Sequence, residues 1–84
     1  MTEILNAEIA AGASSADLTV AALEPHGVNT EVACRVAAKN ATSGTLHTLA
    51  RLRAGEAVVV FPTTATLVIQ SLDAAAGVVQ VTAK

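Results

Sequence analysis

The chain of 84 residues holds few side chains that act as nucleophiles, bases or metal ligands: His26, His47 and a single cysteine, Cys34. His26 stands between Pro25 and Gly27, a context typical of turns, so we expect its imidazole to lie in solvent. His47 falls in a different segment, and neither histidine has a second ligand at the spacing that zinc sites use. The sequence therefore predicts no metal site and no cofactor.

Catalysis by a cysteine or serine is not indicated either. Cys34 lies in an alternating segment that points it inward beside Val32 and Val36, and a thiol buried among apolar groups has a raised pKa and reacts slowly. Ser14 and Ser15 lack the glycine-flanked turn that exposes a catalytic serine. The acidic residues stand singly, without the close pair that glycoside hydrolysis needs, and no glycine-rich phosphate loop is present. We predict that the chain is not an enzyme.

Composition disfavours several classes of binding protein. The chain is 52% hydrophobic but 1% aromatic, with 19 Ala and 11 Val against one Phe. Five basic and seven acidic residues give a formal net charge of -2, which disfavours nucleic acid as a direct partner, and the absence of Tyr and Trp disfavours sugar stacking. No stretch is long and apolar enough for a membrane-spanning helix, and the N-terminus does not read as a secretory signal, so we expect synthesis in the cytoplasm and no membrane partner.

Short alternating segments dominate the chain. The alternation of apolar and polar residues predicts strands, with turn residues between them, over residues 17–22, 31–38, 57–61, 66–72 and 78–82. The last two segments, joined by Asp73 to Gly77, read as a terminal hairpin. Residues 45–53 fit a strand, which we favour, or a short helix capped by Ser43. We expect an all-β fold, a small antiparallel sandwich or barrel of six to seven short strands.

The first residues are expected to differ from the rest. Residues 3–10 fit an edge strand or an extended arm, and residues 10–16 (AAGASSA) fit a flexible link. We therefore divide the chain into an arm with its link, residues 1–16, and a single β domain, residues 17–84. In the arm, Ile4, Leu5 and Ile9 are the side chains expected to contact a partner.

Two surfaces are predicted to make contacts. Strands over 57–61 and 66–72 are apolar on both faces, whereas a chain this short covers one face of each sheet, so a second copy is expected to cover the other. The expected oligomer interface consists of Val58, Val60, Phe61, Val68, Leu72, Val79 and Val81. A polar contact face is expected to form where the strands that bear the basic residues pair; its members are Arg35, Lys39, Arg51 and Arg53.

In layout the chain resembles the small accessory virion proteins of tailed bacteriophages. The likeness lies in the segment from Ile4 to Ala22 (ILNAEIAAGASSADLTVAA), the strand from Glu31 to Ala38, the stretch from Leu52 to Val60 and the C-terminal segments. Such proteins are short, rich in Ala, Thr and Val, and poor in cysteine. The chain departs from many of them by lacking a tyrosine in its last strand.

The resemblance implies a structural role in the virion. It suggests a β-rich decoration, cement or head-fibre subunit, commonly trimeric, that binds the major capsid protein or another virion protein. The alternative is an immunoglobulin-like module that contacts a tail or surface receptor through the loops at residues 24–27 and 40–44. A small enzyme subunit is a third hypothesis, which a pocket joining Cys34 or His47 to a carboxylate would favour.

Overall fold

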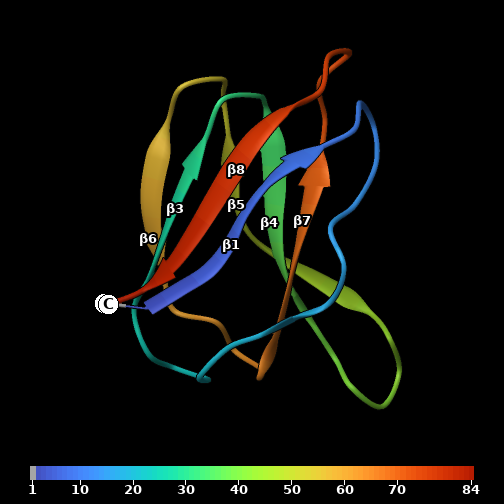
Figure 1. Cartoon of the computed structure of the whole chain (residues 1–84). Helices are drawn as coiled ribbons and strands as arrows, with labels where there is room; N and C mark the ends of the chain where they lie inside the picture. The colour runs from blue at the N-terminus through green and yellow to red at the C-terminus, as the bar shows by residue number, and fades with distance from the viewer. Residues whose placement is uncertain (1) are drawn as a thin grey trace.

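The computed structural model describes residues 2–84, and within this range it contains eight strands and no helix. The strands form two four-stranded antiparallel sheets that pack face to face (Figure 1). Sheet A has the order β1-β8-β3-β6 and sheet B the order β2-β7-β4-β5. The strands are β1 (Thr2–Ile9), β2 (Leu18–Thr19), β3 (His26–Thr30), β4 (Cys34–Lys39), β5 (Leu46–Leu52), β6 (Ala57–Val60), β7 (Thr66–Ser71) and β8 (Gly77–Ala83).

The pairing shows that the described chain is one long antiparallel hairpin. The numbers of paired residues add to 85 or 86 in all four pairs β1-β8, β2-β7, β3-β6 and β4-β5, for example Thr2 with Ala83 and Cys34 with Leu52. The tip of this hairpin is the turn Asn40–Thr45, where the Asn40 side chain accepts hydrogen bonds from two backbone N–H groups. A long hairpin wound into two sheets in this way is a jelly roll.

The predicted fold class is confirmed, because the structure is an all-β sandwich. Residues 45–53 form a strand, β5, and eight strands replace the expected six to seven. The predicted terminal hairpin is wrong: β7 lies in sheet B and β8 in sheet A. Their connection crosses between the sheets, and Leu72 donates its N–H to the Ala33 carbonyl of the neighbouring crossover instead of turning back within one sheet.

Small aliphatic side chains fill the space between the sheets. Leu67 and Ile69 of sheet B meet Val79 and Val81 of sheet A, and all four are fully buried. Because these side chains are short, the sandwich is only 17 Å thick and extends about 30 by 29 Å in the other directions. No Phe, Tyr or Trp side chain contributes to this core cluster.

The N-terminal segment is part of the sandwich. Strand β1 pairs with β8 along its length, as the edge strand of sheet A, and Ile9 is buried in the core while Ile4 and Leu5 pack against it. The expected flexible link is hydrogen-bonded to β7 through Ser15 N–H to the Ile69 carbonyl and Ser71 N–H to the Ala13 carbonyl. Residues 2–16 are therefore an edge strand and a fixed connection, and the three apolar side chains expected on a free arm serve the chain's own core.

Candidate functional site: interaction surfaces

Cys34 lies at the start of β4 and is fully buried, as its alternating segment predicts. Burial raises the pKa of its thiol, and the Thr30 hydroxyl beside it opposes this shift only in part. The thiol is thus held in its unreactive protonated form, out of contact with solvent.

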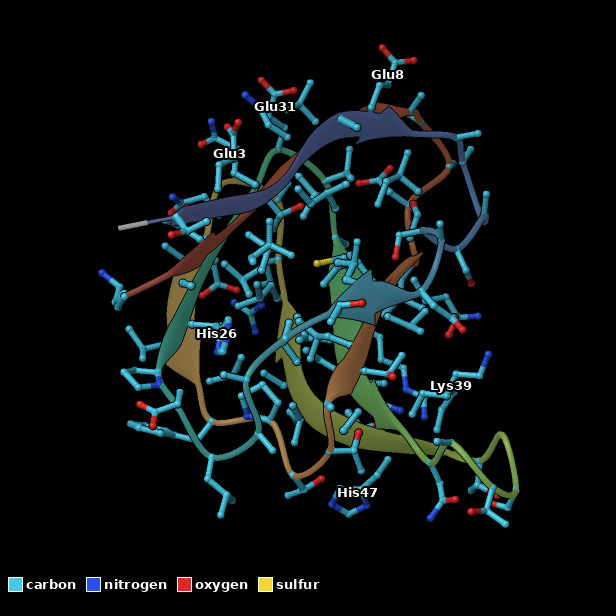
Figure 2. All side chains as sticks on the ribbon, turned by 60° about the horizontal axis from the view of Figure 1, so that its bottom comes forward. Glu3, Glu8, His26, Glu31, Lys39 and His47 are labelled. Atoms are coloured by element: carbon cyan, nitrogen blue, oxygen red, sulfur yellow. The ribbon has the colours of Figure 1, made fainter. Side chains whose placement is uncertain are left out.

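His26 is not the solvated turn residue that its neighbours suggest. It begins β3 and is 1% exposed, with its Nδ1 at 2.8 Å from the Glu24 carbonyl oxygen and no partner for Nε2 in the described chain. Pro25 is tolerated at this point because it precedes the strand's first paired residue. His47 is exposed on β5, at a distance from His26 (Figure 2).

The described residues hold no cluster of three or more histidine, cysteine or acidic side chains that would suit a metal ion. Two pockets lie on the outer side of sheet A, and neither is lined by Cys34 or His47. A pocket that joins Cys34 or His47 to a carboxylate, which would favour an enzyme, is therefore not found among these two.

Most of the side chains expected at an oligomer interface lie inside the chain. Val60, Val68, Val79 and Val81 are buried, and Val58 is half-buried against the core. The expectation assumed that a short sandwich leaves one face of each apolar strand bare. In the structure Val58, Val60, Val79 and Val81 face inward, and Val68, which points to the outer side of sheet B, is buried as well.

An exposed apolar patch remains at the edge of sheet A. Phe61, the only aromatic residue of the chain, is 57% exposed just after the edge strand β6, and Val59 of that strand is 48% exposed. Leu23 is 72% exposed in the neighbouring loop, which is held there by a 2.7 Å hydrogen bond from its N–H to the Pro62 carbonyl. We call Leu23, Val59 and Phe61 the β6-edge patch.

Leu23 also has an unusual backbone, with a φ of 65°. A bulky residue in the left-handed region costs about 1–2 kcal/mol, and such residues gather at functional sites. The sequence interpretation named Phe61 but missed Leu23 and Val59. A signal was present for Leu23, because a large apolar side chain just before Glu24-Pro25 stands in a turn.

The outer side of sheet A is acidic and rich in amides. Glu8 lies opposite Val78, while Gln80 lies opposite Asn6 on one side and Asn29 on the other, so these residues share the solvent side of the sheet. Figure 2 shows Glu3, Glu8 and Glu31 pointing away from the body on this side. We call the side that bears Glu3, Glu8, Glu31 and Glu56 the acidic face; its one basic side chain is Lys84, which lies over Gly27.

A pocket of about 290 Å³ opens at one end of the acidic face. Its polar lining comes from Glu31, Glu56, Asn29 and Gln80. Glu31 Oε1 accepts a 2.9 Å hydrogen bond from Val78 N–H, and Glu56 Oε1 accepts one of 2.5 Å from Arg53 N–H. Each carboxylate has a second oxygen with no hydrogen-bond partner among the described residues.

The outer side of sheet B is basic, and it collects the predicted polar contact residues. The strands that bear them pair, with Arg35 directly opposite Arg51, and Arg53 continues the alternation beyond β5. Arg35 lies along the sheet, with its Nε donating to the Thr48 hydroxyl and its Nη1 to Gln70 Oε1 at 3.3 Å. We call the side that bears Arg35, Arg51 and Arg53 the arginine face.

Lys39 follows Arg35 on the same side of β4 but has a partner. Its ammonium group lies 3.0 Å from an Asp17 carboxylate oxygen, the one ion pair within residues 2–84. Its charge is therefore balanced within the chain, whereas the three arginines have no carboxylate of residues 2–84 within ion-pair distance.

Comparison of the chain with protein-family models, curated proteins and solved structures found no match. Within residues 2–84 no helix is long and apolar enough to cross a membrane.

Proposed function

We propose that the chain is a structural subunit of a tailed-bacteriophage virion, which associates with itself and decorates the capsid through contacts to coat protein. The observation that carries the self-association is the exposure of Phe61, the only aromatic ring of the chain. The virion setting comes from the resemblance in length, composition and order of segments.

An exposed aromatic ring is informative in this chain because the core is closed without it. Aromatic side chains supply much of the binding energy of protein interfaces, usually near the centre of a contact and with smaller apolar groups around them. Phe61 has such neighbours in Val59 and Leu23. The β6-edge patch therefore replaces the five predicted valines, Val58, Val60, Val68, Val79 and Val81, in the proposed oligomer interface.

The fold is compatible with this role without specifying it. Jelly rolls build viral capsid subunits, but they also build lectins and other unrelated proteins, so function has to be argued from the surface. The strand order also differs from that of an immunoglobulin domain, in which the first two strands pair in one sheet, because β1 and β2 lie in different sheets here.

The first experiment measures the mass of the chain by light scattering in about 0.5 M salt, where charges are screened within roughly 4–5 Å. We expect a closed oligomer for the natural chain, a monomer for Phe61→Asp and an unchanged oligomer for Ala74→Asp, which adds the same charge in the exposed β7-β8 connection. A monomeric natural chain, or an oligomer that Phe61→Asp leaves intact, would overturn the self-association and favour a monomeric module that binds through its loops.

The virion setting has its own test. We expect peptides of the chain in purified particles of the phage that encodes it, at a fixed ratio to coat protein. Particles without the chain would overturn this part of the proposal, whatever its oligomeric state.

A further inference from the structure

We propose that the acidic face and the arginine face bind each other, so that a second copy of this chain stacks the arginines of sheet B on the glutamates of sheet A. This contact centres on the pocket lined by Glu31 and Glu56, whereas the β6-edge patch, of which Val59 lies on the same side of sheet A, centres on Phe61.

No carboxylate in the described part of the chain forms an ion pair with the arginine face. Arg35 and Arg51 are direct cross-strand neighbours, and like charges at such positions repel. Asp17 is engaged by Lys39, and Asp73 accepts hydrogen bonds from backbone N–H groups. Leu72, 52% exposed beyond β7 on the same sheet, adds apolar surface beside the charges. Such a surface suits a partner that brings carboxylates and displaces water from a small apolar area.

The acidic face offers acceptors in the required form. A guanidinium group has five N–H donors and no acceptor, and it binds carboxylates in a planar, two-pronged geometry. The pocket lined by Glu31 and Glu56 presents two partly free carboxylates beside the side-chain oxygens of Asn29 and Gln80. Arg51 and Arg53 are the exposed donors, since Arg35 is already bonded to Thr48 and Gln70.

The placement of the two faces permits stacking. The β3-β4 and β5-β6 connections lie at the same end of the sandwich (Figure 1), and they carry Glu31 and Glu56 toward one face while Arg35 and Arg51 lie on the other. A copy displaced along the short axis, by the 17 Å backbone thickness plus the room that the facing side chains need, therefore sets arginines over glutamates. A face of about 30 by 29 Å is large enough for an ordinary interface, which buries roughly 800 Å² per partner.

Such a contact is heterologous, because each copy gives a different face. It leaves one acidic and one arginine face free at the two ends of any stack, so the stack is open unless its rotation closes it.

Nucleic acid would use the arginine face alone. It is disfavoured by the acidic face behind it and by the position of Phe61, which lies at the edge of the other sheet and offers no stacking ring beside the arginines.

The test uses the full chain with Phe61→Asp, which removes the β6-edge contact, and measures mass by sedimentation velocity. We expect association at about 20 mM salt that weakens by about tenfold or more at about 0.5 M. Arg51→Glu with Arg53→Glu abolishes it. Glu31→Gln with Glu56→Gln does the same, while the glutamines can still accept the bonds from Val78 and Arg53 N–H.

The decisive step mixes the two double variants at low salt. Each retains one intact face, so the mixture is expected to form dimers of one copy of each, although neither variant associates alone. Glu24→Lys, a charge change in the β2-β3 loop at the other end of the sandwich, serves as the control that leaves association intact. Absence of salt-sensitive association, failure of the mixture to form dimers, or binding of a DNA duplex by the arginine face without self-association would overturn the proposal.

Discussion

Asp73 joins two crossovers at one end of the sandwich. Its Oδ2 accepts a 3.3 Å hydrogen bond from Ala33 N–H in the β3-β4 connection, and its Oδ1 accepts one of 3.1 Å from Ala75 N–H in its own loop. These bonds favour the ionised carboxylate and lower the pKa of Asp73 below its ordinary value of 3.8. The same interactions therefore stabilise the fold more when Asp73 is ionised than when it is protonated.

This gives a prediction with a defined sign. Since the folded pKa of Asp73 is lower than the unfolded one, its stabilisation is present above about pH 4 and is lost as the pH falls through the folded pKa. Asp73→Asn should thus be less stable than the natural chain at about pH 7, and the gap should shrink at about pH 3. Urea titrations followed by circular dichroism measure both free energies of unfolding. A gap that is independent of pH would show that the charge of Asp73 contributes nothing.

The residue scale is also where sequence reasoning was weakest. Alternation placed Cys34 inside correctly, but Pro25 and Gly27 made His26 read as a turn residue. The glycine actually pairs within sheet A, and the Lys84 side chain lies over it on the outer side. Proline and glycine mark strand ends as well as turns, so local composition could not distinguish a buried first strand residue from a solvated loop.

At the scale of elements, β8 begins where the β3-β4 connection crosses it. Gly77 pairs with Ile9 of β1, and a Cβ atom at Gly77 would overlap the Val32 side chain, which is buried in that connection. Glycine is needed here to let another segment approach the strand, since no positive φ is involved. The contact fixes where β8 enters sheet A.

We therefore predict that Gly77→Ala destabilises the fold by about 1–3 kcal/mol through overpacking. Val32→Ala removes the overlapping methyl groups, so the double variant should lose less stability than the sum of the two single changes. Urea unfolding of the four proteins measures this coupling. Additive losses would mean that the strand shifts to accommodate the methyl group without pressing on Val32.

Sequence patterns identified most strands but not their partners. The segments predicted as strands over residues 45–53 and 66–72 correspond to β5 and β7, although β7 buries Leu67, Val68 and Ile69 in succession. The prediction of a terminal hairpin was wrong because a short connection with a glycine can also join strands of two different sheets. The valines predicted at an oligomer interface are buried instead, because strands distant in sequence decide which face of a strand is covered. Arg35 and Arg51 were found together because their strands, β4 and β5, are joined by a local turn.

The strand pairing of the whole molecule indicates a simple order of assembly. In the four pairs β1-β8, β2-β7, β3-β6 and β4-β5, the numbers of the paired residues add to nearly the same value. Only β4-β5 is local, as these strands are joined by the six residues Asn40–Thr45. Closing a long loop costs more chain entropy than closing a short one, and β1-β8 pairs the two ends of the described chain. Once β4-β5 has formed, however, each further strand pair costs only the chain entropy of closing the two connections that join it to the previous pair.

We therefore predict that folding starts at the tip and proceeds outward to β1-β8. Leu52→Ala, in the buried part of β5, should slow folding strongly, whereas Ile9→Ala, in the buried part of β1, should mainly speed unfolding. Stopped-flow circular dichroism gives both rates without a tryptophan. Both substitutions remove a large aliphatic side chain from the same core cluster, so their equilibrium losses are comparable and the contrast lies in the kinetics. Equal effects on the folding rate, or a larger one for Ile9→Ala, would show that the two sheets form together and that the common register reflects the finished fold alone.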